Sequence, residues 1–423
     1  MLQVNVLRND PQFVKERLGV KNFKQVELVD EIIALDDERK KLQAEFDLLQ
    51  SKINASSKNI GKLIAAGNKE EAEQLKTSVA EWKTKLDPIK RKGSETENML
   101  AEALVLLPNL PSENVPKGIS AEDNETVKEG GSNPSLIENA LPHWELTKKY
   151  KLIDFELGTK ITGAGFPVYT GKGAKLQRAL IQYFLDYNTA AGYKEIIPPF
   201  MVNTESAFAT GQLPDKEGQM YFVNEDGFYL IPTSEVPVTN IYRDTIVKQD
   251  ELPIKMTAYS PCFRREAGSY GKDVRGLNRL HQFEKVEIVQ LVEAEKSYNV
   301  LDEMVSHVEQ LLLSLQLPYR VLRLCGGDMS FASALTYDFE VYSAAQQRWL
   351  EVSSVSNFET FQSNRMKCRY KGENGKNKLV HTLNGSSLAL PRIMACLLEN
   401  NQTENNIQLP EVLHKYFGAG VID

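Results

Sequence analysis

Apolar residues recur at steps of three, four or seven over the first quarter of the chain. From Val26 onward the apolar stripe comprises Leu28, Ile32, Leu35, Leu42, Phe46, Leu49, Ile53, Ile60 and Leu63. This heptad spacing marks one face of a long helix. After the turn-forming residues 65–68 the stripe resumes at Leu75, Val79, Trp82, Leu86 and Ile89. Two long helices joined by a short turn predict an antiparallel hairpin.

Two residues interrupt the return helix. Pro88 lacks the backbone N–H that a helix interior uses, and Gly93 falls on the apolar stripe. We therefore expect a kink or a break near residues 87–93. Ahead of the hairpin, Asp10 is a good N-cap and Pro11 suits a first helical turn, so we expect a short helix after Asp10.

A change of composition ends the helical part of the chain. Pro108 and Pro111 stop any helix, and the residues that follow are polar and contain glycine and proline. The pattern predicts three parts, which are an N-terminal domain with a long helical arm at 1–108, a linker at 109–135 and a second domain at 136–423.

The second domain mixes helical and strand-like patterns. Helices are expected at Trp144–Leu157, Ala174–Ala190 and Leu390–Asn400, and a helix-to-strand passage at 194–200 ends in Pro-Pro. Short strand-like runs are expected between Tyr221 and Ile254, at Phe339–Tyr342, at Trp349–Ser354 and at Val380–Ser387. These elements predict an α+β domain whose sheet is antiparallel and flanked by helices.

The stretch from Pro261 to Leu291 has the most informative pattern. Its second half alternates from Phe283 to Gln290, so Phe283, Lys285, Glu287 and Val289 face one way. A loop with Gly268, Gly271 and Gly276 precedes it, which predicts two antiparallel strands joined by a long loop. Arg264 and Glu266, two positions apart, are expected on one face of the first strand. Charges on a covered sheet face need a partner, and a charged ligand is the simplest one.

Composition limits the class of protein. The chain has 423 residues, of which 42% are hydrophobic and 25% charged, as in soluble globular proteins of two or three domains. Apolar runs such as Ala103–Leu107 are far shorter than the roughly 20 residues of a membrane span. Arg8, Asn9 and Asp10 stand where a signal peptide would be apolar, so we expect a cytoplasmic protein with no membrane partner.

The cysteines do not form a metal pattern. Cys262, Cys325, Cys368 and Cys396 are widely spaced, without a Cys-x-x-Cys pair. Reduced, buried thiols are expected, and no zinc site is expected.

The net charge of −7 provides no global positive field for a nucleic acid, so any such contact must use a local patch. Between Asp47 and Glu70 there is no acidic residue, while four lysines lie there at the far end of the hairpin, namely Lys52, Lys58, Lys62 and Lys69. A basic tip suits a phosphate backbone. A dimerising coiled coil with a solvated basic face is the alternative.

The sequence FRREAG at 263–268, followed by GLNRLHQFEKVEIV at 276–289, resembles motif 2 of the class II aminoacyl-tRNA synthetases, and in detail that of the seryl-tRNA synthetases. KEIIPPF at 194–200 is similar to motif 1 of the class, and TLNGSSLALPR at 382–392 to motif 3. The resemblance covers essentially the whole chain. It implies a class II catalytic domain with an antiparallel sheet, preceded by a coiled-coil arm.

The resemblance also implies the reaction, in which serine and ATP form seryl-adenylate with Mg²⁺ and serine is then transferred to tRNA. It implies that ATP is bound by Arg264, Glu266, Phe283, Glu351, Val352, Ser353, Ser354 and Arg392. Among these, Arg264, Glu266 and Arg392 would act in catalysis, and Glu351 and Ser354 would hold Mg²⁺. Serine would be bound by Thr233, Ser234, Glu235, Arg264, Glu287, Thr382, Asn384 and Ser386.

The implied partners are serine tRNA, L-serine, ATP and a second copy of the chain in a homodimer. The lysines Lys52, Lys58, Lys62 and Lys69 would contact the tRNA, and the selenocysteine tRNA would be a further substrate where an organism has one. Two alternatives stay open. A related ligase could act on another acceptor, although such relatives lack the long arm. A non-catalytic RNA-binding paralogue should have lost the phosphate- and magnesium-binding groups, which are present here.

The chain departs from the family pattern at Leu335, Phe358, Glu359, Thr360 and Asn364. None of these is a substrate position implied by the resemblance. We expect the departures to affect packing or RNA contacts and not the reaction.

Overall fold

A computed structural model describes residues 1–215, 218–266 and 275–423. Contacts between residues divide the chain into two compact units. The first unit comprises Met1–Gly19 and Phe23–Pro108, and the second comprises Val20–Asn22 and Asn109–Asp423.

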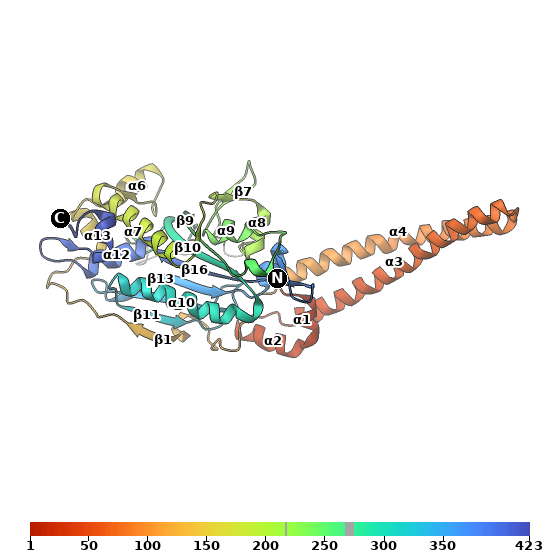
Figure 1. Cartoon of the computed structure of the whole chain (residues 1–423), viewed down its shortest axis with the longest axis horizontal. Helices are drawn as coiled ribbons and strands as arrows, with labels where there is room; N and C mark the ends of the chain where they lie inside the picture. The colour runs from red at the N-terminus through yellow and green to blue at the C-terminus, as the bar shows by residue number, and fades with distance from the viewer. Residues whose placement is uncertain (216–217, 267–274) are drawn as a thin grey trace. The chain divides into compact units, whose positions relative to one another are not determined.

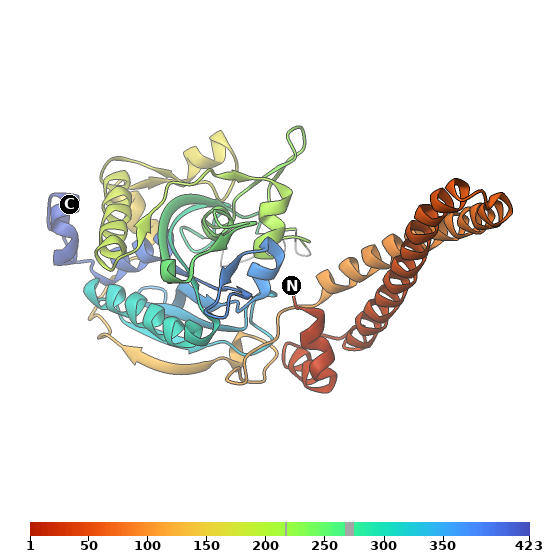
Figure 2. The same ribbon diagram turned by 45° about the vertical axis from the view of Figure 1, so that its right-hand side comes forward.

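The first unit is helical. Its elements are α1 (Val4–Asn9), α2 (Pro11–Val20), α3 (Leu28–Ala65) and α4 (Lys69–Leu106). Figure 2 shows α3 and α4 side by side as an antiparallel pair, which confirms the predicted hairpin. Members of the apolar stripe such as Ile32, Ile53 and Val79 are buried between the two helices. The short helix after Asp10 is also confirmed, since the Asp10 carboxylate accepts a hydrogen bond from the Phe13 N–H as an N-cap.

Of the kink or break predicted near residues 87–93, the structure excludes the break. Helix α4 runs without interruption from Lys69 to Leu106 with Pro88 inside it. Pro88 is exposed, so water can reach the carbonyl group that has lost its helical partner. Gly93 has open space where a Cβ would be, and it causes no break. Packing of α4 along α3 therefore outweighs the local preference of these two residues.

A buried carboxylate joins α1 to the start of α3. Asp36 is 3% exposed and lies within hydrogen-bonding distance of three cations, which are Arg8, Arg39 and Lys40. Burial acts to raise the pKa of Asp36, but the hydrogen bonds from Lys40, Arg39 and Arg8 outweigh burial and lower the pKa to about 2. The ionised form of Asp36 therefore stabilises this end of the hairpin.

The second unit is built on an eight-stranded sheet within the described residues, in the order β1-β11-β12-β13-β16-β10-β9-β4. All neighbours are antiparallel except β4 and β9, which are parallel. The strands are β1 (Glu125–Gly130), β4 (Lys194–Glu195), β9 (Ile254–Phe263), β10 (Gln282–Val292), β11 (Tyr319–Arg323), β12 (Leu335–Ser343), β13 (Arg348–Asn357) and β16 (His381–Ala389). The predicted antiparallel α+β fold is thus confirmed (Figure 1).

Two local expectations differ from the structure. Part of the segment expected as a linker, Glu125–Gly130, forms strand β1 at the edge of the large sheet by pairing with β11. The single helix expected at Trp144–Leu157 is two short helices, α5 (His143–Lys149) and α6 (Phe155–Ile161), separated by β2 (Ile153–Asp154). Pairing partners far away in sequence decide both cases, and a local pattern does not contain them.

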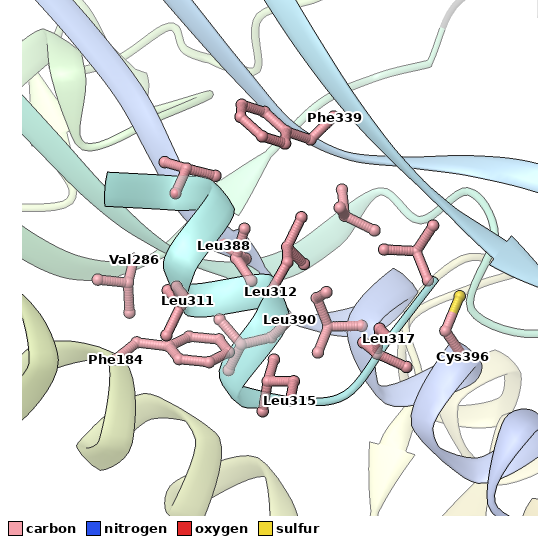
Figure 3. Close-up of a cluster of buried hydrophobic side chains, with 14 of the residues drawn as sticks. Phe184, Val286, Leu311, Leu312, Leu315, Leu317, Phe339, Leu388, Leu390 and Cys396 are labelled. Atoms are coloured by element: carbon pink, nitrogen blue, oxygen red, sulfur yellow. The ribbon is translucent and has the colours of Figure 1, made fainter. Parts of the chain in front are cut away.

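Three long helices cover one face of the sheet (Figure 1). They are α7 (Gly171–Ala190), α10 (Ser297–Ser314) and α12 (Leu390–Asn400). Figure 3 shows Phe184 of α7, Leu311 of α10 and Leu390 of α12 in the same apolar cluster as Val286 of β10. Because side chains alternate along β10, Lys285 and Glu287 lie on the face opposite to Val286.

The remaining helices are α8 (Thr204–Thr210), α9 (Glu235–Asn240), α11 (Phe361–Met366) and α13 (Glu411–Phe417). The remaining strands are β3 (Val168–Tyr169), β5 (Met201–Val202), β6 (Phe222–Val223), β7 (Phe228–Leu230), β8 (Ile246–Val247), β14 (Arg369–Lys371), β15 (Asn377–Leu379), β17 (Ile407–Gln408) and β18 (Val421–Ile422). All four cysteines are free and buried, as expected. Among the helices of the described residues, none combines the length and the apolar character that crossing a bilayer requires.

The Asp36 cluster generates the first prediction. Replacing Asp36 with Asn should lower the free energy of unfolding of the first unit by about 2 kcal/mol at neutral pH. The pKa is depressed from 3.8 to about 2, so this stabilisation is present above pH 3.8 and disappears as the pH falls towards 2. Thermal unfolding of the full chain followed by helical circular dichroism, at neutral and acidic pH, measures the effect.

The matched control is Asp37→Asn. Asp37 lies 2.5 Å from Arg8 as well, but its side chain is 61% exposed. An exposed pair contributes at most about 1 kcal/mol. Equal losses of melting temperature in the two variants would contradict the assignment of the stabilisation to the buried carboxylate.

Candidate functional site

A cavity of about 630 Å³ opens on the face of the sheet that carries Lys285 and Glu287. Side chains from distant segments line it. They include Thr233, Glu235, Arg264, Glu266, Asn278, Arg279, Phe283, Lys285, Glu351, Val352, Ser353, Ser354, Asn384, Ser386 and Arg392. Most of the residues singled out in the sequence therefore lie around one space, which is polar and charged.

Arg264 and Glu266 both line the cavity, but the expectation that they lie on a strand is wrong. Strand β9 ends at Phe263, and Glu266 has a φ of 48°. The Arg264 guanidinium lies 5.2 Å from the centre of the Phe283 ring, and Glu266 pairs with Arg279 at 3.0 Å. The loop that follows, including Gly268 and Gly271, falls at 267–274, outside the described residues.

The polar end of the cavity is built around a buried carboxylate. Glu287 is 1% exposed, and its Oε2 atom lies 2.6 Å from Lys285 Nζ and accepts a hydrogen bond from the Thr233 hydroxyl at 3.2 Å. Its Oε1 atom has no hydrogen-bond partner among the described residues. Burial raises the pKa of Glu287, against the charge of Lys285. One oxygen of this buried carboxylate therefore has an unused acceptor position next to the cavity-lining residues Thr233 and Lys285.

A second carboxylate lies beside it. Glu235, in the first turn of α9, accepts a hydrogen bond from Gln362 Nε2 at 2.6 Å, and the Oε1 atom of Gln362 accepts one from Thr382 at 2.7 Å. Burial and the charge of Glu287 raise the pKa of Glu235 to about 7. Two buried carboxylates, Glu235 and Glu287, lie near a single lysine, Lys285. This part of the cavity therefore favours a cationic ligand.

A fixed guanidinium forms another part of the cavity wall. Arg392, near the start of α12, donates hydrogen bonds to the backbone carbonyls of Asn278 at 3.1 Å and Glu351 at 2.7 Å. Its Nη1 atom also lies 3.5 Å from the Glu351 carboxylate. These contacts orient the planar group along the wall formed by β13, which suits an aromatic or phosphate ligand.

Strand β13 has a bulge where it lines the cavity. Its pairing with β12 shifts between Phe339 and Glu340, so that Glu351 and Ser353 oppose neighbouring residues and Val352 is extra. The four residues Glu351 to Ser354 all line the cavity. The Ser353 hydroxyl donates to the Ser386 carbonyl at 2.6 Å, which joins β13 to β16 at this point.

Three of the expected site residues do not line the cavity directly. Glu287 borders it through Thr233 and Lys285, as described. Thr382 is buried and acts on the site through Gln362. Ser234 is fully buried, and its hydroxyl pairs with Ser260 at 2.6 Å. Ser234 therefore supports the turn that presents Thr233 and Glu235.

Sequence reasoning did not assign Lys285, Gln362, Asn278 and Arg279 to the site. Alternation along β10 places Lys285 on the same face as Glu287, so that signal was present in the sequence. Gln362 is separated from Glu235 by 127 residues, and no local pattern connects the two.

Among the departures from the family pattern, Leu335 is a core residue at the start of β12, as expected for packing. Phe358 is buried and lines the cavity, so this departure does reach the site.

The four lysines at the far end of the hairpin are exposed. Lys52, Lys58 and Lys62 lie on α3 and Lys69 at the first position of α4. They are therefore accessible to a polyanion, and they lie in the first unit, apart from the cavity residues, which all belong to the second unit.

Comparisons with known proteins agree with this arrangement. The family model of the class II core domain of tRNA synthetases for G, H, P, S and T matches residues 221–401, and that of the seryl-tRNA synthetase N-terminal domain matches residues 1–111. The serine–tRNA ligase of Salinibacter ruber is 50% identical over 420 residues, which cover 99% of this chain and 98% of that protein.

Two solved structures are similar over the whole chain. Seryl-tRNA synthetase from Pyrococcus horikoshii, complexed with ATP, has a TM-score of 0.94 at 30% identity and covers 100% of this chain and 99% of its own. Cytoplasmic serine–tRNA ligase from Naegleria fowleri, in complex with AMP, has a TM-score of 0.89 at 27% identity, with the same coverage.

The two buried carboxylates generate a prediction about pH. The pKa of Glu235 is raised from 4.5 to about 7, so the folded state binds more protons than the unfolded state in this window. Stability should therefore fall as the pH rises from about 4.5 to about 7 and then level off. Glu235→Gln removes this loss and should gain roughly 3 kcal/mol relative to the parent across the window.

Melting temperatures of the unliganded parent and Glu235→Gln, measured from about pH 5 to about pH 8, test this expectation. Glu205→Gln, which changes an exposed carboxylate on α8, is the matched control and should track the parent. A difference between Glu235→Gln and the parent that does not change with pH would refute the raised pKa.

Proposed function

The chain belongs to the seryl-tRNA synthetase family, and we propose that it uses the cavity residues to join serine to serine tRNA in two steps. In the first step serine and ATP form seryl-adenylate and pyrophosphate. In the second step the seryl group passes to the terminal ribose of the tRNA. The observation that carries the proposal is the Glu287 carboxylate, buried and with one oxygen unpartnered among the described residues, at one end of a cavity that also holds Arg264 and Arg392.

The first step needs positioning and charge neutralisation more than a protein nucleophile. An oxygen of the serine carboxylate attacks the α-phosphorus, and the bond from that phosphorus to the bridging oxygen of pyrophosphate breaks. Arg264 lines the cavity with its guanidinium 5.2 Å from the centre of the Phe283 ring, and we expect it to contact the α-phosphate and the serine carboxylate together. Glu266, held by Arg279, would accept hydrogen bonds from the nucleotide.

Serine selection would depend on the paired carboxylates. The serine ammonium would be attracted to Glu287 and Glu235, and the serine hydroxyl would donate to the remaining oxygen of Glu287. Lys285 holds Glu287 in place at 2.6 Å. An amino acid without the hydroxyl would leave a buried acceptor unpaired, which disfavours it. Asn384 and Ser386, on β16, complete this end of the wall.

ATP would lie between Phe283 and Arg392. Both line the cavity, and Arg392 is held in place by the carbonyls of Asn278 and Glu351. An adenine between an aromatic ring and a guanidinium gains stacking on both faces. The charge of Arg392 would also neutralise the terminal phosphates.

The donor set next to this position fits Mg²⁺. Glu351 and Ser354 supply a carboxylate and a hydroxyl, which are the hard oxygen ligands that Mg²⁺ prefers. Asp338 lies opposite Ser354 on β12, and its Oδ1 atom has no hydrogen-bond partner among the described residues. Glu351 and Ser354 would hold the ion, which when bound supplies positive charge to the ATP phosphates.

The alternatives are less well supported. A ligase for another acceptor should lack the arm, whereas α3 and α4 extend over 38 residues each. A non-catalytic paralogue should have lost charged groups, whereas Arg264, Glu266, Glu351 and Arg392 all line the cavity.

Further parts of the proposal concern partners. The arm with its exposed lysines would bind serine tRNA, and the selenocysteine tRNA where present. A homodimer would form through the segment that resembles motif 1, where Ile197 is 85% exposed. We place the reaction in the cytoplasm, where free thiols such as the four buried cysteines stay reduced.

Amino-acid-dependent pyrophosphate exchange tests the first step. With each standard amino acid in turn, serine should support the fastest exchange. Glu287→Gln keeps the shape of the side chain but removes its charge, and it should lower serine-dependent exchange by about two orders of magnitude or more. ATP binding, measured by calorimetry, should change little. The assignment is wrong if another amino acid supports faster exchange in the parent.

A deletion separates the arm from the chemistry. Removing Leu42 to Leu86 and joining the ends by a short glycine-containing turn should leave serine-dependent exchange nearly intact and abolish aminoacylation of serine tRNA. The reason is that the two helices extend on the order of 50 Å, at about 1.5 Å per residue, and carry none of the cavity residues.

A milder variant, with Lys52, Lys58, Lys62 and Lys69 changed to Gln, should weaken tRNA binding and flatten its dependence on salt. Glu70, Glu71 and Glu73, acidic residues at the start of α4, offer a control set whose change to Gln should not weaken binding. Loss of exchange with unchanged tRNA affinity would instead make the arm a structural or dimerisation element.

A further inference from the structure

One wall of the cavity is a loop without regular structure. It runs between β11 and β12, and its residues Ser330, Phe331 and Ala332 line the cavity. A Cβ added at Gly211 would lie 3.0 Å from the Cβ of Ala332, so this loop closes against the segment after α8. The Phe331 ring meets the Phe361 ring edge-on at 6.0 Å. Phe361 precedes Gln362, the residue that holds Glu235, so the loop borders the carboxylate end of the cavity.

The carbonyl groups of 330–333 accept hydrogen bonds from outside the loop. Lys21 Nζ donates to the carbonyls of Ser330 at 2.8 Å, Phe331 at 3.2 Å and Ser333 at 2.7 Å. Three acceptors match the three N–H donors of an ammonium group. Burial lowers the pKa of Lys21 to about 7, and its three contacts with the carbonyls of Ser330, Phe331 and Ser333 define the path of this segment.

Asn109 holds the same segment from another side. Its Nδ2 atom donates to the Ala332 carbonyl at 2.9 Å and to the Phe358 carbonyl at 2.8 Å, and its backbone N–H donates to the Phe331 carbonyl at 3.0 Å. Asn109 is 2% exposed. One amide therefore fixes the distance between two cavity-lining segments, one at Ala332 and one at Phe358.

Both residues lie where the chain passes between its two units. Lys21 belongs to the three residues Val20–Asn22 that pack with the second unit, and Asn109 is the first residue after Pro108. The Val20 carbonyl is so close to Gly326 that a Cβ there would lie 1.9 Å from it. The short N-terminal piece of the second unit is thus packed tightly against the same loop.

We propose that Lys21 and Asn109 are positioning residues of the active site, which hold the 330–333 segment so that Phe331 and Ala332 close the cavity at its serine-binding end. The inference rests on the proposed function and extends it to two residues that precede every motif of the catalytic domain. Neither residue touches a substrate. Each acts through the backbone of the loop.

The position of the loop determines which substrate is affected. Its Phe331 ring contacts Phe361, next to Gln362, which holds Glu235, whereas Arg392 is held by the carbonyls of Asn278 and Glu351. Loosening the loop should therefore weaken the use of serine more than the use of ATP. A purely structural role would instead change both KM values and the melting temperature together.

The test is serine-dependent pyrophosphate exchange by the full chain. Lys21→Met keeps the apolar stem and removes the three donors, and it should raise the KM for serine about five-fold or more, with a change of less than about two-fold in the KM for ATP. Lys21→Arg retains donors and should restore the KM for serine to within about two-fold of the parent. Lys24→Met, at an exposed lysine three positions later, is the control and should behave as the parent.

Asn109→Ser provides an independent variant, and the same selective rise in the KM for serine is expected from it if Lys21→Met does not fold. Parental KM values for serine in a folded Lys21→Met, or equal rises for serine and ATP, overturn the inference. Pyrophosphate exchange by the parent protein distinguishes a failure of this inference from a failure of the proposed function. A parent protein without serine-dependent exchange would refute the function itself. The arm deletion, which retains both residues, should keep the parental KM for serine.

Discussion

The burial of Glu287 is the constraint on which the site depends. A carboxylate that is 1% exposed in the middle of a sheet is tolerated only when its oxygens have partners. Lys285 and Thr233 satisfy one oxygen, and the other has no partner among the described residues. Glu235, placed next to it, increases the negative potential and has its own pKa raised. A protein that retains such a pair gives up stability for a cationic ligand with a hydroxyl group.

The sheet can carry this pair because its two faces have different surroundings. Helices α7, α10 and α12 cover one face of the large sheet, and Val286 and Ile288 of β10 are buried there. Lys285 and Glu287 of the same strand lie on the other face, whereas Glu284 lies on the helix-covered face and accepts a hydrogen bond from Gln177 of α7. Strand order places the other site residues next to β10. Strand β10 pairs with β9 on one side and with β16 on the other, and β16 pairs with β13. Residues from Arg264 to Arg392 are thereby brought around one cavity.

The helical arm is stabilised by interactions that do not involve the cavity. Its stability comes from a heptad stripe between two helices and from the Asp36 cluster at its base. None of the cavity residues lies in it. Lys21 and Asn109, where the chain passes from one unit to the other, differ from the arm because they donate hydrogen bonds to the cavity loop. Residues at the boundaries between the two units therefore also contribute to the cavity wall.

The sequence by itself determined the elements whose signals are local. The heptad stripe predicted the hairpin, alternation along β10 placed Lys285 and Glu287 on one face, and the motif residues indicated the reaction. Tertiary structure alone decided what depends on distant partners. The continuity of α4 through Pro88 depends on packing against α3, and strand β1 exists because β11 pairs with it. The contacts of Gln362 with Glu235, and of Lys21 with the 330–333 segment, join positions more than a hundred residues apart. Hydrogen bonds between such positions leave no periodic trace in a sequence, because neither residue constrains the conformation of its own neighbours.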